Sequence, residues 1–148
     1  VEGVRFAGIE TARPTAAVVT ALKEADGVVI APSNPLVSVG PILALAGLPE
    51  LVASQPALAV SPIVGGEAIK GPAAKMLREL GREASPVAIA EGYWDVARGF
   101  VMDEVDAGLA DKVRALGMRV SVAQTVMRSD ADRASLARTC LELLGQLG

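Results

Sequence analysis

The stretch "ALAVSPIVGGEAIKGPAAK", residues 57–75, decides the fold expected for this chain. Its first four residues, Ala57 to Val60, form a short apolar run typical of a strand buried inside a parallel sheet. A glycine-rich loop follows. Pro72 then stands at a favourable first position for an alanine-rich helix, which Gly81 is expected to end. Strand, loop and helix in this order are one unit of an α/β fold.

The same alternation of apolar strands and helical stripes extends outward in both directions. Residues 4–9 are expected to form a strand near an edge, and the β-branched run at residues 28–31 a strand buried on both faces. Further strands are predicted at residues 100–103 and 119–123, and helices at residues 15–25, 42–46, 49–53, 85–91, 109–116 and from Ser129 or Asp130 to the C-terminus. We therefore predict an α/β fold with three layers, in which helices cover both faces of a mainly parallel sheet, and residues 1–148 form a single unit.

Composition excludes several classes of protein. The chain has 148 residues and is 51% hydrophobic, but its apolar runs are too short to span a bilayer. The net charge is −3 and the basic residues are scattered, so we expect no nucleic-acid partner. The single cysteine agrees with a cytoplasmic location. Because histidine is absent, any catalysis has to use carboxylates, lysines, hydroxyls or backbone dipoles.

From the first residues, we expect that an N-terminal portion of the protein is missing from this chain. Val1 is not an initiator methionine, and "VEGVRFAGIE" lacks the basic start and long apolar centre of a signal peptide. We expect that this chain is the C-terminal portion of a larger domain, with removal of a tag or maturation of the terminus as the alternative.

Two unusual loops follow predicted strands and are the candidate site. Ligands of open α/β sheets bind beyond the carboxyl ends of the strands, so both loops should lie on one rim. The first, "APSNPLVS", offers short polar donors, and the second, "SPIVGGEAIKGPAAK", combines glycines with two of the four lysines. Glycines let backbone N–H groups approach an anion closely, which favours a phosphate. The alternative stays open that Gly65 and Gly66 make a tight turn and that Lys70 is merely solvated.

Other candidates are weaker. The acidic segment "MDEVD" follows a strand and has the ligands for magnesium, but it is more often a solvated loop that caps the next helix. Tyr93 and Trp94 are able to stack on a flat ring or to anchor a short helix. Cys140 lies on the apolar stripe of the last helix and is expected in the core.

Three segments resemble signature segments of the 2-phospho-L-lactate transferase family of deazaflavin coenzyme (coenzyme F-420) biosynthesis. They are "ADGVVIAPSNPLVSVGPIL", "VSPIVGGEAIKGPAAKML" and "FVMDEVD". The resemblance implies a Rossmann-like, usually dimeric protein about twice as long as this chain. It also implies a reaction in which a three-carbon acid, activated by guanosine diphosphate, is transferred to the primary alcohol of a deazaflavin precursor with release of guanosine monophosphate, assisted by magnesium.

By this resemblance, nine residues are assigned to the phosphate and substrate crevice: Ser33, Asn34, Pro35, Ser38, Ser61, Pro62, Gly65, Gly66 and Lys70. The family's proposed metal and proton-accepting carboxylates belong to the half that this chain lacks, so no catalytic base is assigned and the chain alone is expected to be inactive. Phospholactate, phosphoenolpyruvate and phosphoglycerate stay open as the transferred acid. Two other readings also stay open, a related sugar-nucleotide-binding regulator without turnover and a generic α/β fragment without an intact site.

Overall fold

The computed structural model describes all 148 residues and is built around a parallel sheet of four strands. Its order is β1-β2-β5-β6, and every neighbouring pair in it runs parallel. The strands are β1 (Val28–Ile30), β2 (Ala57–Val60), β5 (Gly99–Asp103) and β6 (Arg119–Ala123). A small antiparallel hairpin of β3 (Ile63–Val64) and β4 (Glu67–Ala68) forms a separate sheet. The predicted α/β fold with a mainly parallel sheet is confirmed.

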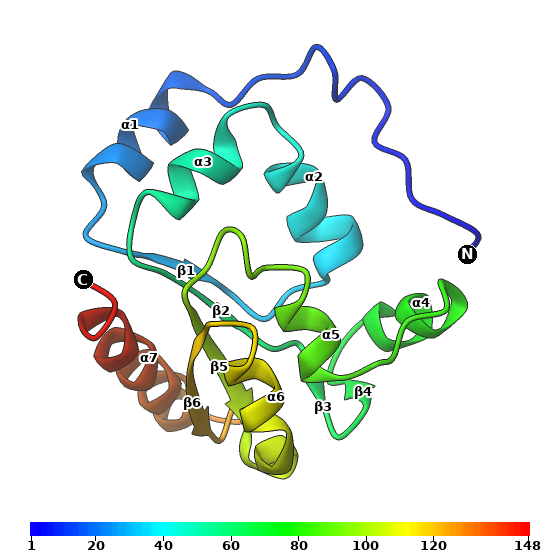
Figure 1. Cartoon of the computed structure of the whole chain (residues 1–148), viewed down its shortest axis with the longest axis vertical. Helices are drawn as coiled ribbons and strands as arrows, with labels where there is room; N and C mark the ends of the chain where they lie inside the picture. Colours follow the sequence, from blue (N-terminus) through cyan, green and yellow to red (C-terminus); the bar gives the residue numbers. More distant parts are fainter.

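Helices cover both faces of the sheet, which gives three layers (Figure 1). The long C-terminal helix α7 (Asp130–Gly145) covers one face alone. The other face carries the remaining helical elements: α1 (Ala16–Glu24), the π-helical turn η1 (Pro35–Val39), α2 (Gly40–Leu43), α3 (Leu48–Ala53), α4 (Ala73–Glu79), α5 (Pro86–Ala90), the 3₁₀ helix η2 (Glu104–Leu109) and α6 (Ala110–Arg114). None of these helices has the length and apolar character needed to cross a membrane.

Side-chain alternation along the central strands divides the core into two parts. In β2, Ala57 and Ala59 face the larger cluster under α3 to α6, whereas Leu58 and Val60 face α7. All residues of β2 and β5 are buried, as expected for strands with neighbours on both sides and a layer on each face. Cys140 lies in the cluster beneath α7, so its predicted core position is confirmed.

Several helix boundaries follow from residues that cap the free N–H groups of the first turn. The hydroxyl of Ser85 accepts a hydrogen bond from the N–H of Ala88 at the start of α5. At the start of α7, the Ser129 hydroxyl accepts from the N–H of Asp132, and the Asp132 carboxylate accepts in return from the N–H of Ser129. This reciprocal pair is a capping box, and it fixes where the chain turns into α7 after the rim of the sheet.

Two of the predicted strands differ from the structure. Residues 4–9 contain no strand, because no neighbouring strand lies beside them to accept a backbone ladder. The run at residues 28–31 does form β1, but it is an edge strand and the side chain of Val29 is 43% exposed. The expectation that it is buried on both faces is therefore wrong.

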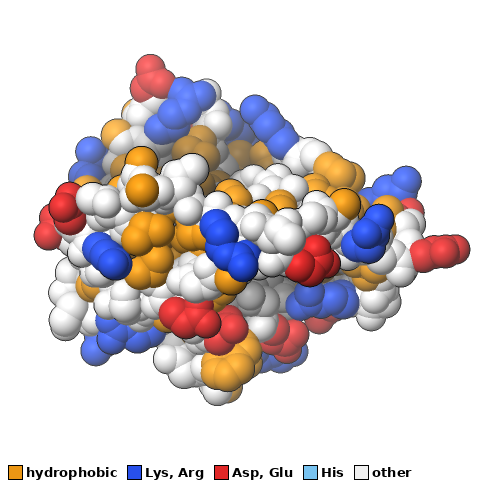
Figure 2. Space-filling view, turned by 90° about the horizontal axis from the view of Figure 1, so that it is seen from above, with side chains coloured by type: hydrophobic (Ala, Val, Ile, Leu, Met, Phe, Trp, Pro, Cys, Tyr) orange, Lys and Arg blue, Asp and Glu red, His pale blue; other side chains and the backbone are white.

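Charged side chains of both signs are interspersed over the face seen in Figure 2, with hydrophobic side chains between them. No continuous area of a single charge sign covers this face. This arrangement agrees with the scattered charge pattern of the sequence.

Candidate functional site

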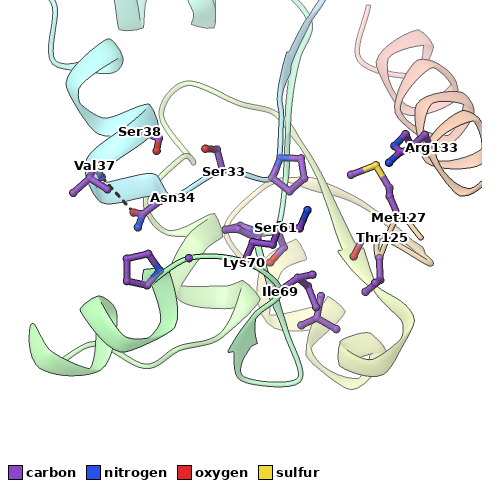
Figure 3. Close-up of a pocket in the computed structure, with 16 residues that line it drawn as sticks. Ser33, Asn34, Val37, Ser38, Ser61, Ile69, Lys70, Thr125, Met127 and Arg133 are labelled. Carbon is purple, nitrogen blue, oxygen red and sulfur yellow. Dashed lines mark hydrogen bonds between the residues drawn. The ribbon is translucent and has the colours of Figure 1, made fainter. Parts of the chain in front are cut away.

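The loop after β1 is shaped by Asn34. Its Oδ1 accepts hydrogen bonds from the N–H groups of Leu36 at 2.9 Å and Val37 at 3.3 Å, which caps the turn η1. Its amide nitrogen points to the sulfur of Met76 on α4, at 3.6 Å. Asn34 thus uses its polar atoms to hold the loop, and the hydroxyls of Ser33 and Ser38 lie on the cavity side of that loop (Figure 3).

The loop after β2 begins with a side-chain turn. The buried hydroxyl of Ser61 donates to the carbonyl of Ile63 at 2.8 Å and accepts from the N–H of Ile63 at 3.1 Å. This local pairing bends the chain sharply as it leaves the sheet. The residues that follow the hairpin of β3 and β4, Ile69 to Gly71, line the same cavity as Ser33.

Gly65 and Gly66 form the tight turn of this hairpin. Their φ angles are +58° and +81°, and positive values at both central residues are what a two-residue hairpin of type I′ requires. The N–H of Gly65 donates to the carboxylate of Asp106 at 3.0 Å. This N–H is therefore already paired within the chain. The alternative that Gly65 and Gly66 make a tight turn is confirmed.

A short strap, defined as residues 69–71, connects the hairpin to α4. Gly71 has a φ of +75°, in the left-handed region where glycine is favoured. The N–H groups of Lys70 and Gly71 donate to no other group of the chain, and the Lys70 ammonium has no carboxylate partner. By contrast, Lys75 pairs with Glu79 on α4 and lies outside the cavity. The strap thus offers unpaired donors next to the cavity.

The two predicted loops share a cavity of about 480 Å³ at the carboxyl ends of the strands. Figure 3 shows Ser33, Asn34 and Ser38 on one side, Thr125, Met127 and Arg133 on the other, and Ser61 and Lys70 between them. The lining contains Lys70 and Arg133 but no aspartate or glutamate, so an anion meets positive charge and no opposing carboxylate there. Val37, Val64, Ile69 and Met127 add apolar surface, which suits a ligand with both a charged and an apolar part.

The predicted site residues divide into two groups. Six of them line the cavity: Ser33, Asn34, Ser38, Ser61, Pro62 and Lys70. Pro35, Gly65 and Gly66 do not. Pro35 starts η1, and Gly65 and Gly66 form the turn between β3 and β4. The expectation that the loops after Ala31 and Val60 lie on one rim is confirmed, because both line the same cavity.

Sequence reasoning missed a third loop. Residues 125–127 and Arg133 also line the cavity, although neither was proposed from the sequence. The signal was present: β6 was predicted, its parallel orientation puts its carboxyl end on the same rim, and the loop after it leads to α7. Arg133 is also paired with Asp130 on the same helix, so part of its charge is neutralised at the rim.

The acidic segment after β5 has a structural role in this chain. Asp103 is 4% exposed and accepts hydrogen bonds from the N–H and hydroxyl of Thr125 and from the N–H of Val105. Burial acts to raise the pKa of Asp103, but these hydrogen bonds outweigh it and hold the pKa below its ordinary value. The interpretation of this segment as a cap for the next helix is confirmed for Asp103, the N-cap of η2. The expectation of a solvated loop is wrong for Asp103 and Asp106, which are both buried.

The residues present do not fit a magnesium site. No group of three or more carboxylate, cysteine or histidine side chains is gathered in the chain, and the oxygens of Asp103 and Asp106 already accept backbone N–H groups. The two neighbouring aromatic residues also lie outside the cavity. Tyr93 is 3% exposed and packs in the core, whereas Trp94 is 62% exposed.

Comparison with known proteins adds an independent line of information. The family model described as "2-phospho-L-lactate transferase CofD" matches residues 1–140. The 2-phospho-L-lactate transferase of Methanocaldococcus jannaschii is 38% identical over 136 residues, which are 92% of this chain and 43% of that protein. The enzyme of the same name from Methanopyrus kandleri is 39% identical over 150 residues, 99% of this chain and 47% of that protein.

A relative with a different printed name is equally similar. The phosphoenolpyruvate transferase of Streptomyces griseus is 39% identical over 139 residues, which are 92% of this chain and 44% of that protein. The chain therefore spans about half the length of the curated relatives it matches. Since the family model covers nearly the whole chain and agrees with the three signature segments and the parallel α/β sheet, the chain belongs to the 2-phospho-L-lactate transferase CofD family.

Proposed function

We propose that the protein containing this chain transfers a 2-phospholactyl or phosphoenolpyruvyl group from a guanosine-diphosphate-activated donor to the ribityl hydroxyl of a deazaflavin precursor, as a step of coenzyme F-420 biosynthesis. The observation that carries the proposal is the cavity at the carboxyl rim, with Lys70 and Arg133 in its lining and no carboxylate. Relatives named as 2-phospho-L-lactate and phosphoenolpyruvate transferases support the class of reaction.

The proposed reaction is an in-line displacement at phosphorus. The ribityl oxygen forms a bond to the phosphorus that bears the three-carbon acid, and the bond from this phosphorus to the bridging oxygen of the diphosphate breaks. Guanosine monophosphate leaves with that oxygen, and the hydroxyl proton is lost. The main tasks of an enzyme in such a displacement are to position the reactants and to stabilise charge on the phosphoryl oxygens.

The residues of this chain fit the binding part of that task. The Lys70 ammonium and the free N–H groups of Lys70 and Gly71 are donors for phosphoryl oxygens, and the Ser33 and Ser38 hydroxyls line the same cavity. Donors that are fixed before the reaction stabilise developing charge at little reorganisation cost. Magnesium assistance is part of the proposal, with ligands supplied from outside this chain because its own carboxylates do not fit a metal. A homodimer in the cytoplasm is proposed from family resemblance.

The test uses the full-length protein with the deazaflavin alcohol, the activated phospholactate and magnesium. The proposal predicts release of guanosine monophosphate together with a phosphodiester product, and it predicts no release by the 148-residue chain alone. A full-length Lys112→Ala variant is a matched control, since Lys112 lies on α6 and does not line the cavity. Tight binding of a uridine-diphosphate sugar without any such release would contradict the proposal and support the regulator.

A further inference from the structure

Two aspartates of the acidic segment each hold one wall of the cavity from behind. Asp103 Oδ2 accepts from the N–H of Thr125 at 2.8 Å and from its hydroxyl at 2.9 Å. Asp106 Oδ2 accepts from the N–H of Gly65 at 3.0 Å. Both carboxylates are buried, with 4% and 8% exposure, and neither lines the cavity. Each bond joins segments far apart in sequence, separated by 22 and 41 residues.

The bond to Thr125 fixes the wall after β6. Thr125 begins the loop of residues 125–127, which lines the cavity. This loop lies between the end of β6 and the capping box of α7, and Asp103 ties it to the end of the neighbouring strand β5. Charge-assisted hydrogen bonds to a buried carboxylate are stronger than neutral ones, so this contact determines where the loop lies.

The bond to Gly65 fixes a second wall of the cavity, formed by the strap, indirectly. Gly65 forms the turn of the hairpin, and the strap that carries Lys70 follows that hairpin. On its other side, the Arg78 guanidinium donates to the Gly66 carbonyl and to the Glu67 carboxylate, each at 2.6 Å. Because the N–H groups of the strap have no partner in the chain, its position depends on the hairpin that precedes it and on α4 behind it.

We propose that Asp103 and Asp106 are positioning residues, whose carboxylates set the separation of the two cavity walls so that the strap of Lys70 and the loop of Thr125 engage one ligand together. This inference deepens the proposed function and rests on it. In this proposal, the acidic segment "MDEVD" contributes to ligand binding by positioning the cavity walls, without holding a metal and without contacting the substrate.

The hydrogen-bond pattern predicts different responses to asparagine at the two positions. Asp103 uses both oxygens as acceptors, because Oδ1 accepts from the N–H of Val105 at 3.1 Å. In Asp103→Asn, the side-chain amide has only one oxygen. If that oxygen accepts from Thr125, the NH₂ group faces the N–H of Val105, and two donors then oppose each other. Asp106 uses one oxygen for Gly65, so Asp106→Asn keeps an acceptor there, whereas Asp106→Ala does not.

The experiment measures amide hydrogen exchange by NMR and guanosine diphosphate affinity by calorimetry, on the full-length protein and its variants. We expect Gly65 to exchange about tenfold faster in Asp106→Ala and close to the parent rate in Asp106→Asn. Thr125 is expected to exchange about tenfold faster in Asp103→Asn. Asp106→Ala and Asp103→Asn should each weaken binding roughly threefold or more, because the loosened wall must be ordered when the ligand binds.

Glu104→Gln is the matched control. It removes one negative charge between the two aspartates, at an exposed residue that makes no side-chain hydrogen bond in the chain, and it should change neither rate nor affinity. If Asp103→Asn does not fold, Thr125→Val removes the hydroxyl bond alone, and the backbone N–H at position 125 should then exchange faster by a smaller factor.

Three results would overturn the inference. The first is unchanged exchange at Gly65 and Thr125. The second is equal acceleration in β2 and β5 with a matching fall in Tm, which would indicate general destabilisation. The third is local acceleration while the affinity equals that of Glu104→Gln. A full-length parent protein that binds no guanosine diphosphate would contradict the proposed function instead, and the exchange rates would still decide whether the aspartates hold the walls.

Discussion

Replacing Lys70 by alanine removes one of the two positive side chains of the cavity. An ammonium about 4 Å from a phosphate charge interacts with ~4 kcal/mol at an effective dielectric constant of about 20, and with ~1 kcal/mol in bulk water. Lys70 is exposed, so the loss of binding free energy should lie nearer the lower value, at ~1.5 kcal/mol. That loss corresponds to an increase of about tenfold in the Kd for guanosine diphosphate.

Isothermal titration of the full-length protein at low ionic strength measures this change directly. The parent affinity should fall with added salt, and the Lys70→Ala affinity should depend on salt less steeply, because one charge has gone from the site. Lys112→Ala removes an exposed lysine that lies outside the cavity and should bind like the parent. Equal Kd values for Lys70→Ala and the parent would refute the reasoning and remove Lys70 from the site.

Further predictions concern stability. Gly99→Ala should lower the free energy of unfolding by ~1–3 kcal/mol in denaturant titration, because the new Cβ would lie 2.9 Å from a methyl group of Leu147 and 3.0 Å from Cβ of Leu58. Gly145→Ala, which meets nothing within 4 Å in α7, should not destabilise the chain, and equal losses would contradict the packing argument. Tyr93→Phe should leave Tm unchanged or raise it, because the buried Tyr93 hydroxyl has no partner and burial raises its pKa to about 12; a clear fall in Tm would reveal a partner. Hydrogen bonds hold the pKa of Asp103 below its ordinary value in the folded chain, so they stabilise the fold above the unfolded pKa. This contribution is lost as the pH falls through the lowered folded pKa, so Asp103→Asn should lose less stability than the parent on acidification. If the free energy of unfolding of Asp103→Asn and of the parent fell in parallel with pH, the stabilising role of the Asp103 carboxylate would be contradicted.

Sequence patterns predicted those parts of the fold that local chemistry determines. The strand at residues 119–123 has the predicted bounds, and Ser85 and Ser129 cap helices as expected, because capping depends on one side chain and the next turn. The strand predicted at residues 4–9 is absent from the structure. The alternation of their side chains suits a strand, but a strand also needs a second strand to pair with. Whether a partner strand lies beside a segment depends on the tertiary fold and not on the local sequence.

The sequence predicted which edge of the sheet carries the candidate site, but not the hydrogen bonds that shape it. Parallel strands put the loops after Ala31 and Val60 together by topology alone. The pairing of Gly65 with Asp106 depends on packing between segments 41 residues apart, which composition and spacing do not report. The same holds for Asp103 and Thr125, whose contact turns a candidate metal ligand into a structural acceptor.

Under the proposed function, the cavity between Lys70 and Arg133 receives the diphosphate of an activated donor. A crystal of this chain soaked with guanosine diphosphate tests it most directly. We expect density for the phosphates within hydrogen-bond distance of the Lys70 ammonium or the N–H of Gly71, in the cavity that Ser33 and Ser38 also line. Density confined to the shallow groove beside Arg114 and Arg119 on the far side of β6, with the rim cavity empty, would contradict it.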